Sequence, residues 1–319
     1  MKRAAIIASA LLLVAVSFAV PPGAATSENP RWAFLTTNLG VFTGTEKLFD
    51  PDDNLFWRLR SKLRNIKASE KLPHAEYRFK VSTDDAGHRL TPEPKSASQT
   101  VLFLGDSCTF GIPVNDGETF PALVQQSLPG VRAINAGVPG YSAFQGRIVL
   151  DQWKGPAPAA VVITFWPNDR SAWDHLSDAE HLELLAAERQ GEFSRHRLTR
   201  LLRRVSPGTR PRLNDEEFAV EIRKMIAWCR GHGSRPILQV WPTQKQALES
   251  VDIDRQIQLR QIASAENVTL VDLVPVVRKA ANPGLFADNV HMRQSGYKLV
   301  AETLAPVIRD ELRQQPPKR

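Results

Sequence analysis

The sequence predicts a three-layer α/β/α fold, with helices on both faces of a parallel, doubly wound sheet, joined to a small amino-terminal accessory region. Its 319 residues are 42% hydrophobic and 24% charged, which is an ordinary globular composition. Short unbroken apolar runs, typical of strands buried on both faces, recur along the chain. Segments with helical character separate these runs. This alternation of strand and helix is the pattern of a parallel sheet covered by helices.

The first buried strand is expected at Val101–Leu104, a run that ends abruptly at Gly105-Asp106-Ser107. The other expected strands cover residues 131–136, 159–165, 236–240 and 268–273. The expected helices cover residues 119–128, 144–153, about 214–230, about 251–266 and a final segment that ends near Leu312.

The amino terminus has the pattern of a secretory signal peptide. Met1-Lys2-Arg3 is basic, residues 4–20 are uncharged and almost wholly apolar, and small residues follow. An uncleaved anchor is the alternative, because the apolar run is close to the shortest length that spans a bilayer. We therefore expect residues 1–25 to be a signal peptide or membrane anchor and the protein to be exported, either periplasmic or extracellular.

The remaining chain divides into an accessory region, residues 26–97, and a main domain, residues 98–316. The accessory region shows one clear strand pattern, Tyr77–Val81, followed by a turn at residues 84–87 and a linker-like stretch at residues 92–98. It contains no recognisable chemistry. The chain has only two cysteines, Cys108 and Cys229, so no disulfide framework holds the fold and a packed core must stabilise it.

Residues 171–213 form an insertion that is predicted to be helical and is rich in arginine. The spacing of Leu198, Leu201, Leu202 and Val205 predicts an amphipathic helix with a basic face. The arginines are Arg189, Arg195, Arg197, Arg200, Arg203, Arg204, Arg210 and Arg212. The net charge of +7 fits an acidic polymer or an anionic membrane surface better than nucleic acid in an exported protein. The basic face of the insertion either contacts such a partner or is simply exposed to solvent while the helix packs on its own domain.

Polar residues follow several of the expected strands, where ligands gather in open α/β sheets. Ser107 follows the first strand, and Asn168 follows the third. Pro139-Gly140 predicts a type II turn that leaves the Gly140 N–H free for a ligand. Each of these residues also has a plain structural interpretation, as a helix cap or a turn residue.

His291 differs from the other six of the seven histidines, because Asp288 precedes it by three residues in a loop. The others are expected at the surface; they are His74, His88, His175, His181, His196 and His232. A carboxylate in this position can hold an imidazole in one tautomer, so the chain contains the groups needed for acyl transfer. A metal site made of Asp106, Asp169, Asp288 and His291 is improbable with one histidine. We predict no metal and no cofactor.

These motifs resemble the conserved blocks of the SGNH hydrolases, also called the GDSL esterase/lipase family, in family order over about residues 98–312. They are Gly105-Asp106-Ser107, Asn135-Ala-Gly-Val-Pro-Gly140, Pro167-Asn168-Asp169 and Asp288-x-x-His291. The resemblance implies an SGNH-like fold, with Ser107 as nucleophile and His291 as general base oriented by Asp288. It also implies an oxyanion hole made by the N–H groups of Ser107 and Gly140 and the Asn168 side chain. Asp106 belongs to the first motif, and we interpret it as a structural residue that fixes the turn.

The resulting hypothesis is an exported serine esterase that removes an acyl group, a short one, from a carbohydrate or lipid. One alternative is an O-acyltransferase that modifies envelope polysaccharides with the same site. A non-catalytic carbohydrate-binding protein is a further alternative, although the intact set of site residues argues against it. Trp166 replaces a small residue of the family pattern and either narrows the acyl pocket or belongs to the core.

Overall fold

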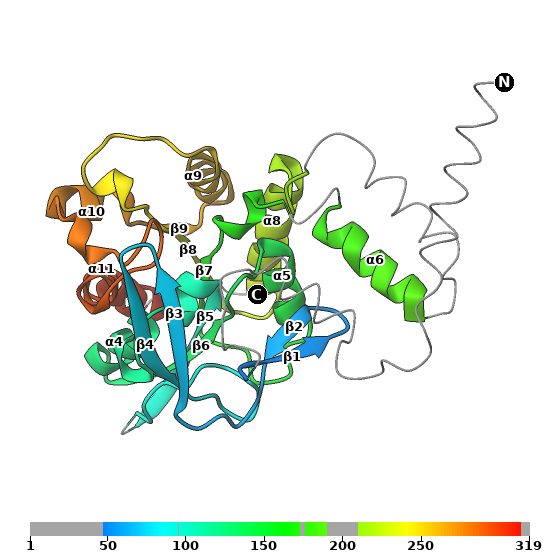
Figure 1. Ribbon diagram of the computed structural model, residues 1–319, viewed down its shortest axis with the longest axis horizontal. Helices are drawn as coiled ribbons and strands as arrows, with labels where there is room; N and C mark the ends of the chain where they lie inside the picture. The colour runs from blue at the N-terminus through cyan, green and yellow to red at the C-terminus, as the bar shows by residue number, and fades with distance from the viewer. Residues whose placement is uncertain (1–46, 95, 173–175, 190–209, 314–319) are drawn as a thin grey trace.

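A computed structural model describes residues 47–94, 96–172, 176–189 and 210–313 (Figure 1). The expected signal peptide or anchor lies outside these residues, and so does the predicted amphipathic helix around Leu198–Val205. In the part of the chain that is described, no helix combines the length and apolar character needed to cross a membrane.

Five parallel strands form the central sheet in the order β6-β5-β7-β8-β9. The strands are β5 (Ala97–Gly105), β6 (Gly130–Gly137), β7 (Ala160–Thr164), β8 (Arg235–Val240) and β9 (Thr269–Asp272). The chain passes from β5 to one neighbour and then crosses to the other side, so the sheet is doubly wound and the predicted fold class is confirmed. The linker predicted at residues 92–98 ends earlier than expected, because β5 begins at Ala97, which pairs with Gly130.

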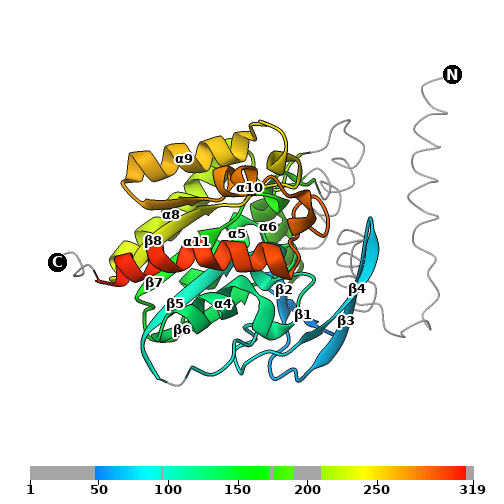
Figure 2. The same ribbon diagram turned by 90° about the vertical axis from the view of Figure 1, so that its left-hand side faces the viewer.

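Helices cover both faces of this sheet (Figures 1 and 2). On one face α4 (Phe120–Ser127) packs against α11 (Gln294–Arg313). On the other face α8 (Asp215–Gly231) packs against α5 (Ala143–Asp151) and α9 (Asp254–Glu266). The core lies between these layers, and Leu102, Phe103 and Ile163 of the central strands are completely buried. The unbroken apolar runs of the sequence are therefore strands with both faces covered.

Short helical segments connect these elements. They are α3 (Ser107–Phe110), η1 (Asp116–Glu118), η2 (Asn168–Arg170), α6 (Asp178–Arg189), η3 (Lys245–Ala247), α10 (Val274–Ala280) and η4 (Pro283–Leu285). Of these, α6 lies in the insertion that was predicted to be helical, whose residues 171–172, 176–189 and 210–213 are described. Helix α10, which is short and follows β9, was not predicted.

The described part of the accessory region consists of two antiparallel hairpins, β1 (Phe49–Asp52) with β2 (Phe56–Leu59), and β3 (Ile66–Leu72) with β4 (Ala75–Val81). The strand expected at Tyr77–Val81 is therefore present, whereas β1, β2 and β3 were not predicted. Figure 2 shows the β3–β4 hairpin at the end of the molecule where α11 begins. The division of the chain into an accessory region and a main domain at residue 97 stays a prediction.

Candidate active site

Ser107 is the first residue of α3, directly after the end of β5. Asp106 caps this helix, because its Oδ1 atom accepts a hydrogen bond from the Cys108 N–H at 2.9 Å. Burial raises the pKa of Asp106 to about 6, although the Cys108 N–H opposes the shift. Gly105 is needed at the turn, since a Cβ atom there would lie 2.7 Å from the carbonyl oxygen of Thr164. The sharp turn places the serine side chain at the carboxyl edge of the sheet.

Ser107, His291 and Asp288 form a continuous chain of hydrogen bonds. The Ser107 Oγ atom lies 2.8 Å from His291 Nε2, and His291 Nδ1 lies 2.7 Å from Asp288 Oδ2. The other carboxylate oxygen of Asp288 accepts the N–H groups of Val290 at 2.8 Å and His291 at 2.6 Å. Burial raises the pKa of Asp288, but the hydrogen bonds and the charge of His291 outweigh it and the pKa lies below its ordinary value. The carboxylate is therefore ionised and fixed in orientation.

The turn after β6 has the predicted type II geometry. The Tyr141 N–H donates to the Val138 carbonyl at 3.1 Å, and Gly140 has a φ of +80°, a value that favours glycine. Among the described residues no acceptor contacts the Gly140 N–H. This N–H is thus available to a ligand.

Three consecutive carbonyl oxygens of this turn each accept a hydrogen bond from a different segment of the chain. The donor–acceptor pairs are Trp57 Nε1 with Pro139 O (3.0 Å), Arg212 Nη1 with Gly140 O, and Asn168 Nδ2 with Tyr141 O (3.0 Å). Because every carbonyl is held, the turn cannot rotate without breaking several hydrogen bonds at once. The segment we call the clamped turn, residues 138–141, is therefore a rigid part of the site.

Asn168 follows β7, the neighbour of β5, and so lies beside Ser107 as the sequence predicted. Its side-chain nitrogen donates to Asp106 Oδ2 at 3.1 Å as well as to the Tyr141 carbonyl. The amide has two N–H groups, and both have protein acceptors. Donation to a substrate oxygen therefore requires one of these hydrogen bonds to be shared or replaced. The structure brings all five candidate residues together: Ser107, Gly140, Asn168, Asp288 and His291.

The insertion contributes a buried ion pair that the sequence analysis missed. Arg212 and Asp178 have side chains that are 1% and 0% exposed, and Arg212 Nε lies 2.9 Å from Asp178 Oδ1. Arg210 pairs with Glu180 at 2.8 Å and with Glu217. These two arginines therefore pair with carboxylates rather than add to a free basic face. Nothing in the local sequence distinguishes Arg212 from its neighbours, because its partners are far away along the chain.

His181 and Trp166 are both buried. His181 was expected at the surface, but it is buried because α6 packs on the first hairpin, where the His181 ring contacts the edge of Phe56 at 6.3 Å between centroids. Trp166 is buried in the core and its Nε1 atom donates to the Trp241 carbonyl at 2.9 Å, so the core interpretation holds. His74 and His232 are exposed and His88 is half-buried, whereas His175 and His196 lie outside the described residues.

The four residues weighed as a metal site do not act as one cluster. Asp169 Oδ1 accepts the Ala143 N–H at 2.8 Å, and Asp106 binds the Cys108 N–H and Asn168. In the described ranges no group of three or more histidine, cysteine, aspartate or glutamate side chains is suited to hold a metal ion. The arrangement contains a hydroxyl, a base and hydrogen-bond donors, which is the set of groups that acyl transfer requires.

Comparison with known families gives a match over residues 103–299 to the GDSL-like Lipase/Acylhydrolase family. The chain belongs to this family. Membership makes it a hydrolase of ester bonds and agrees with the resemblance seen in the motifs. The family match begins inside β5 and ends inside α11, so it leaves out both hairpins of the accessory region.

Solved structures with a similar fold include three from bacteria. A member of the lipolytic G-D-S-L family from Veillonella parvula is 17% identical, with a TM-score of 0.47 over 66% of this chain and 98% of its own. A lipase/acylhydrolase from Enterococcus faecalis is 21% identical, with a TM-score of 0.45 over 69% and 100%. The acetylxylan esterase Axe2 from Geobacillus stearothermophilus is 17% identical, with a TM-score of 0.45 over 71% and 99%. Comparison with curated proteins gave no match.

Proposed function

We propose that the protein is a serine esterase in which Ser107 Oγ attacks the acyl carbon of the substrate while His291 Nε2 accepts its proton. Asp288 holds the imidazole and stabilises its protonated form. The oxyanion accepts hydrogen bonds from the N–H groups of Ser107 and Gly140 and from the Asn168 side chain. His291 then returns the proton to the leaving alcohol, and water releases the acyl group from Ser107 by the same steps in reverse.

The observation that carries this proposal is the hydrogen-bonded chain Ser107–His291–Asp288, with donor–acceptor distances of 2.8 and 2.7 Å. A nucleophile, a base and an orienting carboxylate within hydrogen-bond reach are the geometric signature of an activated serine. No other described histidine has a serine hydroxyl on one ring nitrogen and a carboxylate on the other.

The test is hydrolysis of p-nitrophenyl acetate, butyrate and octanoate by the parent and by Ser107→Ala. We expect the variant to lose at least about 10³-fold in kcat/KM. Ser98→Ala, at an exposed serine in β5, is the matched control and keeps the parent activity. Full activity in Ser107→Ala would exclude Ser107 as the nucleophile.

The proposed substrate is a short acyl ester of a carbohydrate or lipid, and the net charge of +7 favours an anionic one. The ratio of acetate to octanoate hydrolysis measures the preferred acyl length, and a faster octanoate reaction contradicts the short-acyl proposal. Transfer is distinguished from hydrolysis by adding methyl glucoside as an acceptor and measuring acylated sugar against free acid. Free acid as the main product supports the esterase, whereas acylated sugar supports the acyltransferase.

We also propose that the protein is exported. The support is the pattern of residues 1–25, a basic start followed by an apolar run and small residues. Expression with a carboxyl-terminal tag, cell fractionation and amino-terminal sequencing test it. A soluble product that starts near residue 26 indicates a cleaved signal peptide, a membrane-bound full-length chain indicates an anchor, and full-length protein in the cytoplasm contradicts export.

A further inference from the structure

Glu70 is a buried acidic residue in the β3–β4 hairpin with no hydrogen-bond partner among the described residues. It is 1% exposed, and neither carboxyl oxygen has a hydrogen-bond donor among the described residues. It alternates along β3 with exposed Lys67 and Lys71, and shares its face of the strand with buried Ala68 and Leu72. Burying a carboxyl without hydrogen bonds is unfavourable, so the fold alone gives no reason for a glutamate at this position.

The β3–β4 hairpin lies beside the loop that carries Asp288 and His291. The hairpin lies at the end of the molecule where α11 begins, which is also where the loop carrying Asp288 and His291 ends (Figure 2). Burial raises the pKa of Glu70 to about 7, with the charge of His291 lowering it and that of Asp288 raising it. Glu70 pairs across the hairpin with Tyr77, and the Arg293 guanidinium lies 5.9 Å from the centre of the Tyr77 ring. The hairpin therefore faces the His291 loop.

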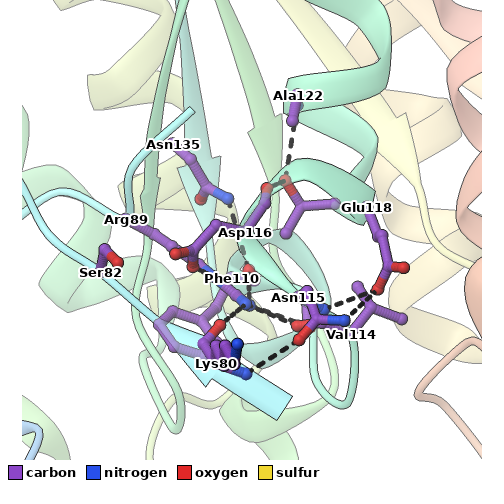
Figure 3. Close-up of polar contacts among 12 residues, drawn as sticks. Lys80, Ser82, Arg89, Phe110, Val114, Asn115, Asp116, Glu118, Ala122 and Asn135 are labelled. Atoms are coloured by element: carbon purple, nitrogen blue, oxygen red, sulfur yellow. Dashed lines mark hydrogen bonds and ion pairs between the residues drawn. The ribbon is translucent and has the colours of Figure 1, made fainter. Parts of the chain in front are cut away.

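Arg89 fixes this hairpin to the loop that follows Ser107. Its buried guanidinium donates to the Lys80 carbonyl of β4 at 3.2 Å, and also to the carbonyls of Phe110 at 2.7 Å and Gly111 at 3.0 Å. A second contact joins the same two segments, since the Lys80 N–H donates to Asn115 Oδ1 at 3.0 Å. Figure 3 shows these contacts around Arg89 and Asn115. These hydrogen bonds therefore hold the hairpin against the segment that follows Ser107.

We propose that Glu70 is a specificity-determining residue that binds a hydroxyl group on the alcohol half of the ester substrate. The inference rests on the proposed serine esterase mechanism, in which His291 returns a proton to the leaving oxygen, so that the alcohol half lies on the His291 side of the acyl carbon. A carboxyl group that faces His291 from the hairpin meets that half. Carboxyl oxygens accept hydrogen bonds from hydroxyl groups, and adjacent hydroxyls of a sugar can occupy both. The substrate class is therefore an ester of a polyhydroxylic alcohol.

The test compares two substrates with Glu70→Met and Glu70→Gln. One is p-nitrophenyl acetate, whose leaving group has no further hydroxyl, and the other is a methyl glucoside that carries a single acetyl group. We expect Glu70→Met to lose about 10-fold or more in kcat/KM on the sugar ester, chiefly through KM, and less than about 2-fold on p-nitrophenyl acetate. Urea unfolding at pH 8 should show that the same variant is at least as stable as the parent. Glu76→Gln, at an exposed glutamate in the same hairpin, is the control.

Each outcome decides the proposal. Equal losses of kcat/KM on both substrates would show that Glu70 acts through His291 and Asp288 and not through the alcohol. That result would overturn the proposal. Unchanged kinetics on the sugar ester, or a parent that cleaves only p-nitrophenyl acetate, would also overturn it while leaving the serine mechanism intact. A parent inactive on both esters would overturn the proposed function and this inference with it. If Glu70→Met does not fold, Glu70→Gln replaces it: this variant keeps the shape of the side chain and one acceptor oxygen, so it should lose less than about 10-fold on the sugar ester but still more than on p-nitrophenyl acetate, and equal effects on the two substrates would overturn the proposal.

Discussion

Replacing Arg212 by methionine tests whether the insertion holds the clamped turn in place. The side chain is 1% exposed, donates to Asp178 at 2.9 and 3.2 Å through Nε, and also holds the Gly140 carbonyl. The substitution leaves Asp178 as a buried charge without its cation. Breaking a buried ion pair in this way costs about 3–5 kcal/mol of the free energy of unfolding. Hydrolysis of p-nitrophenyl acetate should fall as well, because the Gly140 N–H loses its fixed direction.

Urea unfolding followed by fluorescence measures the change in stability, and Arg210→Met is the matched control two positions away. Arg210 pairs with Glu180 and Glu217, but its side chain is 35% exposed, so its loss should cost no more than about 1 kcal/mol. Adding Asp178→Asn to Arg212→Met removes the unpaired charge and should recover part of the loss. Equal effects of Arg210→Met and Arg212→Met, or no recovery in the double variant, would refute the reasoning.

Three further predictions concern the site and its surroundings. Asn168→Ala should lower kcat/KM on p-nitrophenyl acetate by about 10²–10³-fold, and a loss of only a few-fold would mean that Asn168 merely ties Asp106 to the clamped turn. Arg89→Met removes buried hydrogen bonds to several carbonyls, so it should lower the free energy of unfolding by an amount on the order of 3 kcal/mol and shift the urea midpoint downward. An unchanged midpoint would contradict the role of Arg89 as the link between the hairpin and the loop. Burial raises the pKa of Asp169 from 3.8 to about 7, so its contribution to stability is present below pH 3.8 and is lost as the pH rises through 7. Asp169→Asn should therefore flatten the fall in unfolding free energy between pH 4 and pH 8, and a profile parallel to that of the parent would show that Asp169 is not the group responsible.

The sheet and the candidate site could be predicted from the sequence because their signals are local. Apolar runs mark strands buried on both faces, and Ser107 and Asn168 stand directly after such runs. His291 could be selected because Asp288 lies three residues away, and the two side chains are indeed hydrogen-bonded. Pro139-Gly140 predicted its turn for the same reason, since the conformation is determined by the two residues themselves.

The groups that the sequence did not reveal depend on distant partners. Arginine is usually found at the surface, yet Arg89 is buried because carbonyls of residues 110–114 surround its guanidinium. Glu70 alternates with lysines in a short strand, and only the packing of the hairpin shows that its side chain is buried. His181 was misjudged because its polar neighbours in sequence conceal the contact with Phe56. No local pattern carries such information.

The clamped turn limits how far this protein can be shortened and still work. Its Pro139 carbonyl accepts a hydrogen bond from Trp57, a residue that lies well before the segment matching the family, residues 103–299. Tyr141 returns a hydrogen bond to the Trp57 carbonyl at 2.6 Å, so the two segments hold each other. A chain trimmed to the matching segment would keep every proposed catalytic group and lose the indole that holds the clamped turn. Shortening this enzyme to the family boundaries would thus remove part of the scaffold of its candidate active site.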